Sequence, residues 1–188
     1  MIKETGIDFN SLPDEDFDNP LGESTGAGVI FGATGGVIEA AVRTAYEWLT
    51  GETLEFVDFH ALRGIQGIRE ATIDIAGTEV KIGVAHGLGN ARKLLEAIRR
   101  GESKYHAIEI MACPGGCVGG GGQPFHHGDD TIIKKRTEAI YREDQGKARR
   151  KSHENKDVMK LYEEFLGEFY GEKAHELLHT HYVAREKI

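Results

Sequence analysis

The two cysteines of the chain lie close together in a loop that is rich in glycine. Cys113 and Cys117 are separated by Pro-Gly-Gly, and four consecutive glycines follow at positions 119–122. Two thiolates at this spacing can reach one metal centre, and soft thiolate ligands favour iron–sulfur clusters or zinc. Because glycine has no Cβ, the backbone can wrap closely around a bulky inorganic cluster and direct N–H groups toward it. Residues 112–124 therefore predict a metal or cluster site.

Three other interpretations of these cysteines stay open. The thiols could be packed in a core, where free cysteine is often found. A redox-active dithiol is a weaker interpretation, because that chemistry usually uses two intervening residues. A zinc site would need two further ligands, and the nearest candidates are His106, His126 and His127. A [4Fe–4S] cluster normally takes four cysteines, so two of its ligands would have to come from elsewhere.

A second glycine-rich segment lies earlier in the chain. Residues 26–36 form a short apolar stretch that ends in a glycine turn. Apolar residues at helical spacing then predict a helix over 37–49, which Gly51 ends. A loop that leads into a helix N-terminus presents free backbone N–H groups to an anion or a negatively charged cofactor. The geometry expected for this segment therefore suits an anion or a negatively charged cofactor.

The remaining pattern predicts an α/β fold with a mixed sheet, flanking helices, a β-hairpin and a helical C-terminal region. We expect a short strand at 54–59, a hairpin of 71–75 and 79–84, a helix at 91–100 and a strand at 105–111 that runs into the cysteine loop. Two further helices are expected at 130–145 and 156–170. Residues 1–25 should form an irregular acidic arm, residues 26–170 one lobe of a domain, and residues 171–188 a polar tail.

The composition narrows the classes of function. Hydrophobic residues make up 39% of the chain and charged residues 29%, as in ordinary soluble globular proteins. A net charge of -8 argues against nucleic-acid binding, and the one basic run, 147–151, is most simply a solvated helix end or loop. No apolar run is long enough to span a membrane. Two cysteines without an export signal point to the cytoplasm.

Four segments resemble the [FeFe]-hydrogenases, in the order and with the spacing of that family. Residues 109–124 look like the family's third signature, and the other segments are 30–41, 84–91 and 179–182. The resemblance implies that the chain is the C-terminal half of a hydrogenase catalytic domain. The family's first two signatures have no counterpart here. They carry the other two cubane cysteines, the proton-relay cysteine and a lysine that binds cyanide.

The resemblance implies the H-cluster as cofactor, a [4Fe–4S] cubane joined through one cysteine sulfur to a two-iron unit with CO and cyanide ligands. Cys113 would ligate the cubane, and Cys117 would ligate it and bridge to the two-iron unit. Met111 would lie against that unit, and Phe31 and Val37 would line its apolar pocket. The remaining cofactor-binding residues in this interpretation are Gly32, Thr34, Pro114, Gly115, Gly116 and Gln123.

The activity that the resemblance implies is the reversible reduction of protons to H₂. With half of the ligands and no relay cysteine, the isolated chain is expected to be inactive. It could be an expressed fragment, a truncated or split gene product, or a subunit completed by another polypeptide. The expected partners are the missing N-terminal half, in the same or another chain, and a redox partner subunit or ferredoxin. Electron exchange with NAD(P) and a homo-oligomer of the chain are further expectations.

Two alternatives to a hydrogenase follow from the same resemblance. One is an H₂-sensing relative, and the other is a hydrogenase-like iron–sulfur assembly protein that makes no H₂. The retained Met111 argues against the sensor. The unbroken run 119–123 argues against the assembly protein.

Overall fold

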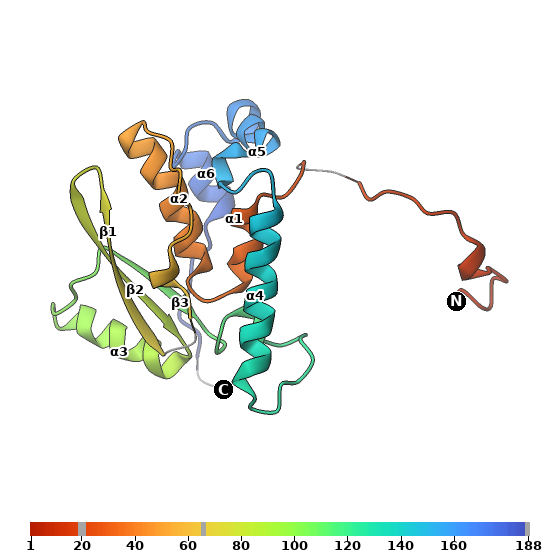
Figure 1. Cartoon of the computed structure of the whole chain (residues 1–188), viewed down its shortest axis with the longest axis horizontal. Helices are drawn as coiled ribbons and strands as arrows, with labels where there is room; N and C mark the ends of the chain where they lie inside the picture. The colour runs from red at the N-terminus through yellow and green to blue at the C-terminus, as the bar shows by residue number, and fades with distance from the viewer. Residues whose placement is uncertain (19–21, 65–66, 187–188) are drawn as a thin grey trace.

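A three-stranded sheet forms one side of the computed structural model, which describes residues 1–18, 22–64 and 67–186 (Figure 1). Strands β1 (Ile68–Ile75) and β2 (Thr78–His86) are antiparallel, and β3 (Ala107–Met111) pairs with β2 in parallel. Ala76 and Gly77 close the β1–β2 hairpin with φ of 54° and 79°, as the right-handed twist of a two-residue hairpin requires. The mixed sheet with flanking helices confirms the predicted fold class.

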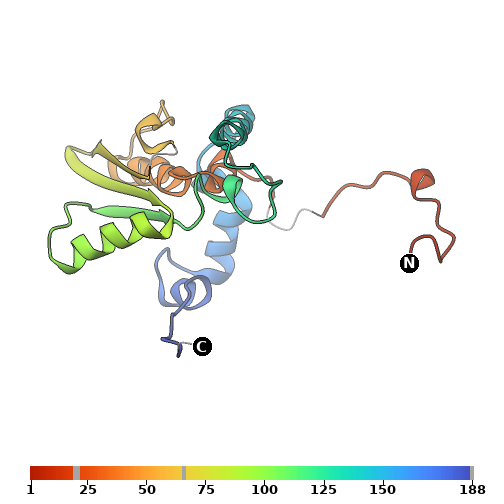
Figure 2. The same ribbon diagram turned by 90° about the horizontal axis from the view of Figure 1, so that it is seen from below.

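Helices cover both faces of this sheet. α2 (Gly36–Thr50) lies on one face and α3 (Leu88–Arg99) on the other (Figure 2). α4 (Asp130–Gly146) packs against the short α1 (Gly26–Val29). α5 (Lys156–Leu161) and α6 (Glu172–Leu178) follow toward the C-terminus, while residues 1–18 extend away from the rest of the described chain. No helix in these described ranges is long and apolar enough to cross a membrane.

Two apolar clusters position α2. One lies between α2 and the sheet, and the other between α1, α2 and α4. The members of the first are Val42, Leu62, Ala71, Ile82 and Val84, and those of the second are Ala27, Ile30, Ala33, Ala40 and Tyr141. Because α2 is buried from both sides, its N-terminus is held in a fixed place relative to the end of β3.

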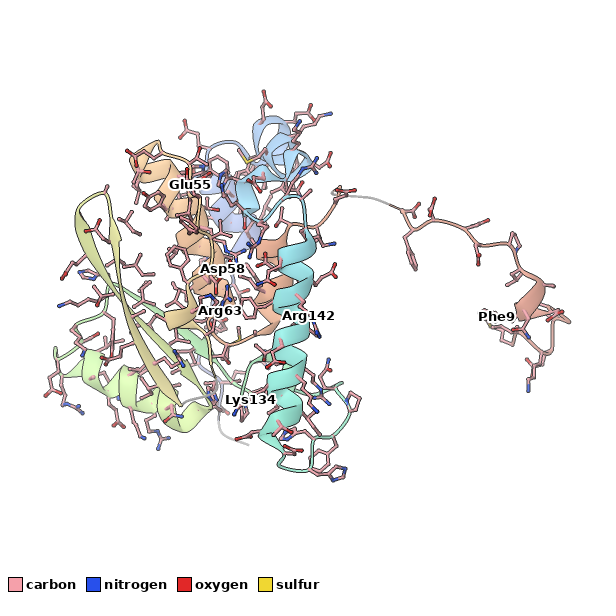
Figure 3. All side chains as sticks on the ribbon, viewed as in Figure 1. Phe9, Glu55, Asp58, Arg63, Lys134 and Arg142 are labelled. Carbon is pink, nitrogen blue, oxygen red and sulfur yellow. The ribbon has the colours of Figure 1, made fainter. Side chains whose placement is uncertain are left out.

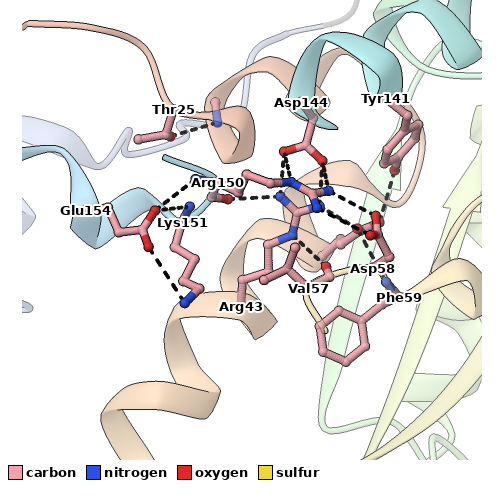
Figure 4. A network of polar contacts seen from close by, with 12 residues as sticks. Thr25, Arg43, Val57, Asp58, Phe59, Tyr141, Asp144, Arg150, Lys151 and Glu154 are labelled. Atoms are coloured by element: carbon pink, nitrogen blue, oxygen red, sulfur yellow. Dashed lines mark hydrogen bonds and ion pairs between the residues drawn. The ribbon is translucent and has the colours of Figure 1, made fainter. Parts of the chain in front are cut away.

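A fully buried arginine joins α2 to α4 and the segment that follows it. Each of the five N–H groups of the Arg43 guanidinium donates a hydrogen bond (Figure 4). Two of them reach Asp144 Oδ1 and Oδ2, both at 2.9 Å. The other three reach Glu39 Oε1 at 2.8 Å and the carbonyl oxygens of Val57 and Arg150 at 2.8 and 2.9 Å.

A second layer of charge surrounds this arginine. Glu39 accepts hydrogen bonds from Arg63 Nη2 at 2.6 Å and from the Tyr141 hydroxyl at 3.1 Å. Arg63 and Arg150 both donate to Asp58 Oδ1, at 2.6 and 3.0 Å, and Figure 3 shows Asp58 and Arg63 in the space between α2 and α4. Burial alone would raise the pKa of Asp58, but the hydrogen bonds from Arg150 and Arg63 outweigh it and hold that pKa at about 2.

The predicted strand at 54–59 is wrong. The segment contains no strand and leads into a 3₁₀ turn, His60–Leu62. Its backbone groups bond to side chains of α2 instead of a neighbouring strand: Val57 O accepts from Arg43, and Phe59 N donates to Glu39 Oε1 at 3.4 Å. The apolar residues in this stretch gave the pattern of a strand, but the ladder partner that a strand needs is replaced by buried charges.

The basic run at 147–151 is also more than a solvated helix end. Lys151 is buried and its Nζ lies 2.5 Å from Glu47 Oε1 on α2. Arg150 is bound to Asp144 and Asp58 as described above. Only the start of the run behaves as predicted, since Arg149 is partly exposed and lies 3.9 Å from Glu23. The cations are needed because α2 and α4 bring carboxylates into the interior.

The C-terminal region differs from the predicted helix at 156–170 followed by a polar tail. α5 ends at Leu161 and a π-helical turn, Tyr162–Leu166, follows. Gly167, with φ of 82°, ends that turn. A further helix, α6, then lies within the segment expected to be a tail, and its Ala174 is buried. The boundaries predicted for the arm, lobe and tail as domains stay a prediction.

We expect stability to fall steeply in acid, between about pH 4 and pH 2. Burial opposes ionisation of Glu47, but hydrogen bonds from Lys151, the Leu54 amide and His153 hold its pKa at about 2, as for Asp58. Because these values lie below the ordinary range of about 4, both carboxylates stabilise the fold above pH 4 and lose that effect as the pH falls toward 2. Urea unfolding between pH 6 and 2.5, followed by Trp48 fluorescence, measures it. Asp58→Asn should flatten the acid limb, and equal slopes in both proteins would contradict the assignment.

Candidate metal centre

The cysteine loop begins where β3 ends. Met111, the last residue of β3, pairs with His86, and its carbonyl accepts a hydrogen bond from the Gly87 amide at 2.8 Å. Cys113 is partly buried, and the exposed Cys117 begins the 3₁₀ turn Cys117–Gly119. Both thiols are free. The loop thus lies beyond the carboxyl end of a parallel strand, where α/β folds commonly bind ligands.

At two glycines of the loop a side chain would be crowded by its neighbours. Gly116 has φ of 93°, and a Cβ there would lie 2.8 Å from the Thr34 amide nitrogen and 2.9 Å from the Gly32 carbonyl oxygen. A Cβ at Gly120 would lie 3.2 Å from Cys113 Sγ. The backbone therefore approaches both the earlier glycine-rich segment and the thiol more closely than other residues would allow.

The two glycine-rich segments predicted from the sequence touch each other. The Thr34 amide donates to the Gly115 carbonyl at 3.0 Å, and Gly116 packs against the backbone of residues 32–34. The Thr34 hydroxyl is buried, and within the described residues it has no hydrogen-bond partner. A buried hydroxyl without a partner costs about 1–3 kcal/mol. The free thiols, the glycine cradle and this hydroxyl fit a bound cluster with acceptor atoms.

A carboxylate that sequence reasoning missed occupies the N-terminus of α2. The Gly35 amide donates to Glu109 Oε1 at 2.6 Å, and the Ile38 amide donates to Oε2 at 2.8 Å. Burial raises the pKa of Glu109 above its ordinary value, although these amides oppose the shift. The expectation that these N–H groups are free to bind an external anion is therefore wrong, because an internal carboxylate already holds them. An acidic residue between Ile108 and Ile110 on an apolar strand was the available signal.

The other predicted site residues fall into two groups. Phe31 and Val37 line a largely apolar cavity of about 450 Å³ between α2 and the C-terminal helices, together with Trp48 and Phe169. Buried positions are occupied by Thr34, Gly115 and Gly116, intermediate ones by Gly32 and Met111, and exposed ones by Pro114 and Gln123.

The ligands of the zinc alternative are not gathered by the fold. His106 Nδ1 accepts a hydrogen bond from the Lys81 amide at 2.9 Å, beside β2. His127 packs its ring edge against Phe125 at 4.7 Å between centroids. Within residues 1–18, 22–64 and 67–186, no three side chains from His, Cys, Asp and Glu come together as metal ligands. The two thiols are thus the local donor set of the loop.

Two family models cover most of the chain. The model described as iron only hydrogenase large subunit, C-terminal domain, matches residues 1–121. The chain belongs to the iron-only hydrogenases. A second model of this hydrogenase group, described as iron hydrogenase small subunit, matches residues 130–185. The cysteine loop thus lies at the end of the large-subunit match, and α4 begins the small-subunit match.

Individual hydrogenases are similar along the full length of the chain. The NADP-reducing hydrogenase subunit HndD of Solidesulfovibrio fructosivorans is 60% identical over 188 residues, which are 100% of this chain and 32% of that protein. A solved structure of the [FeFe]-hydrogenase HydA1 from Chlamydomonas reinhardtii is 44% identical with a TM-score of 0.67, over 97% of this chain and 53% of that one. The chain therefore spans about a third of the curated hydrogenases it matches.

A relative outside the hydrogenases is also similar to the chain. The cytosolic Fe-S cluster assembly factor narfl of Xenopus tropicalis is 30% identical over 193 residues, covering 100% of this chain and 40% of that protein. Its identity to the chain is half of that of the NADP-reducing hydrogenase subunit. The similarity to hydrogenases is therefore the stronger one.

Proposed function

We propose that the chain is the C-terminal portion of the catalytic domain of an [FeFe]-hydrogenase, which interconverts protons, electrons and H₂ at an H-cluster. The observation that carries the proposal is the pair of free thiols in a glycine cradle, packed against a second glycine-rich segment through Gly116 and Thr34. The hydrogenase family supplies the identity of the cluster.

Each residue of the loop has a distinct part in this proposal. Cys113 would be a ligand of the cubane, and Cys117 would be the cubane ligand that also joins it to the two-iron unit. Pro114 fixes the turn between them, and the backbone at Gly115 and Gly116 approaches the cluster closely. When bound, the H-cluster supplies the metal chemistry, while the chain orients the cluster and excludes solvent.

The glycine-rich segment at residues 31–38 and the end of β3 would surround the two-iron unit. Phe31, Val37 and Met111 form its apolar wall, which keeps water from a reactive metal. Thr34 supplies a hydroxyl whose donor is free among the described side chains. Gly32 allows close backbone approach, and the exposed Gln123 lies on the outer part of the loop.

The chain supplies half of the cubane ligands, so the other half must come from outside it. A cubane normally takes four cysteines, and the chain has two. The exposed position of Cys117 leaves its sulfur open to a second lobe. We propose that the missing N-terminal half of the domain completes the site, in the same or another chain.

The similarity to the NADP-reducing hydrogenase subunit supports a proposal for the electron partner. We propose that the complete protein exchanges electrons with NADP or a ferredoxin through a redox partner and works in the cytoplasm. Self-association of the chain and the H₂-sensing alternative stay predictions. The assembly-factor alternative predicts a protein that binds a cluster but does not evolve H₂. The following experiment distinguishes that alternative from a hydrogenase.

Reconstitution with iron and sulfide should give the 188-residue chain alone much less than one [4Fe–4S] cluster, because two of four ligands are missing. The complete catalytic subunit, matured with its assembly machinery, should bind a full cluster and evolve H₂. Iron content, absorption, EPR and gas chromatography measure the two samples. A stable one-to-one cubane on the monomeric chain alone would contradict the half-site. A matured subunit that binds a cubane without evolving H₂ would contradict the hydrogenase.

A further inference from the structure

Glu109 connects the two segments of the candidate site. It lies on β3, two residues before Met111 and four before Cys113. Its carboxylate is on the side of the strand that faces α2, where it accepts hydrogen bonds from Gly35 and Ile38. Glu109 thus contacts the N-terminus of α2 and belongs to β3, the strand that leads into the cysteine loop.

The carboxylate is well suited to hold a helix N-terminus. The residue is 7% exposed, and hydrogen bonds to a buried ionised group are roughly twice as strong as neutral ones. The first turn of a helix also stabilises a negative charge through its unpaired N–H groups and the helix dipole. Because Gly35 adopts φ of 91°, its N–H can turn toward the strand.

Two further contacts run between the same segments. The Thr34 amide donates to Gly115, and Gly116 fits against the backbone of residues 32–34 without room for a Cβ. Glu109 lies before the cysteine loop, and these contacts lie within it. We define residues 31–38 as the pocket segment. It is therefore held at two places: by Glu109 on β3, before the cysteine loop, and by the backbone of Gly115 and Gly116 within the loop.

We propose that Glu109 is a positioning residue that couples the pocket segment to the cysteine loop, so that the apolar wall and the two thiols move as one unit. This inference rests on the proposed function, since the coupling matters for the cluster that both segments would surround. Glu109 itself touches neither the thiols nor the cavity. It acts through the backbone of Gly35 and Ile38 at one end and through Met111 at the other.

Glu109→Gln tests the coupling with little change in volume. The glutamine replaces one acceptor oxygen with an NH₂ group that faces an amide N–H, so one of the two hydrogen bonds is lost. Amide exchange in the 188-residue chain, measured by NMR, should become about tenfold faster at Gly35 and Ile38. Faster exchange should also reach Gly116 and Gly119 in the cysteine loop. Increased exchange confined to Gly35 and Ile38 would overturn the coupling.

Glu70→Gln is the matched control. Glu70 is an exposed carboxylate on β1 that accepts hydrogen bonds from Lys104 and Tyr105. The same change of chemical group there should leave exchange at Gly35, Ile38 and Gly116 as in the wild type. A general loosening of the sheet would instead raise exchange in both variants, and that result would also overturn the proposal.

Gly116→Ala perturbs the cysteine loop instead of β3 and tests the same coupling. It serves as the test if Glu109→Gln does not fold. Its Cβ would press on the Thr34 amide, and coupling requires faster exchange in return at Gly35 and Ile38. Unchanged exchange at these two amides would overturn the proposal.

A spectroscopic measurement separates this inference from the proposed function. In the complete matured subunit, the infrared bands of the CO and cyanide ligands should shift in Glu109→Gln and stay in place in Glu70→Gln. Unshifted bands in Glu109→Gln, in a wild type that evolves H₂, would overturn the coupling and leave the function intact. A wild type without these bands would refute the proposed function, while the exchange result in the 188-residue chain would stand.

Discussion

Replacing Arg43 by methionine should lower the free energy of unfolding by about 3–5 kcal/mol, the usual cost of removing one partner from a buried ion pair. The guanidinium is fully buried and donates to Asp144 and Glu39, which are buried as well. Methionine fills much of the volume but supplies no donor. The two carboxylates keep other partners, yet the carbonyl oxygens of Val57 and Arg150 each lose a donor.

Urea unfolding followed by Trp48 fluorescence measures this loss. Arg142→Met is the matched control, because Arg142 is an exposed arginine on the same helix as Asp144 (Figure 3). A surface change of this kind usually alters stability by no more than about 0.5 kcal/mol. Equal changes in the free energy of unfolding for Arg43→Met and Arg142→Met would show that the buried network stabilises the fold no more than a surface arginine does.

Replacing Cys117 by serine in the complete matured subunit should abolish H₂ evolution. In the proposed function this sulfur holds the cubane and joins it to the two-iron unit, and a serine hydroxyl is a poor ligand for iron of this kind. Iron content and the infrared bands of CO and cyanide should fall together with activity. Retained H₂ evolution would contradict the assignment of Cys117 as the bridge.

Two comparison variants make the result specific. Cys113→Ser should lose the cubane signal in EPR, because Cys113 is the other ligand from this chain. His126→Asn should keep the cluster and the activity, whereas the zinc alternative needs histidine ligands near the cysteines. Loss of the metal in His126→Asn would favour zinc over the cluster, because only the zinc alternative uses this histidine.

The local patterns of the sequence predicted the elements that depend on near neighbours. The hairpin, helix α3 and the strand before Cys113 follow from alternation, helical periodicity and turn residues within a few positions. The cysteine loop was recognisable because two cysteines and a run of glycines at this spacing suit a metal cluster.

The features that the sequence did not predict depend on residues far apart in the chain. Glu109 lies 74 positions from Gly35, so the anion at the start of α2 could not be foreseen from the loop itself. The segment at 54–59 resembled a strand because nothing local reveals that Arg43 would take the Val57 carbonyl. The buried role of Lys151 likewise depends on Glu47, 104 positions away.

The buried network changes how the chain divides into parts. Arg43 and Glu39 lie in the region that matches the large-subunit model, whereas Asp144 and Arg150 lie in the region that matches the small-subunit model. The boundary between the two matches falls at exposed residues such as Gly121 and Gly122. Charges that leave water only when both regions are present make each region a requirement for the interior of the other. The two regions therefore share one buried interior, and the boundary between them lies at the surface of the fold.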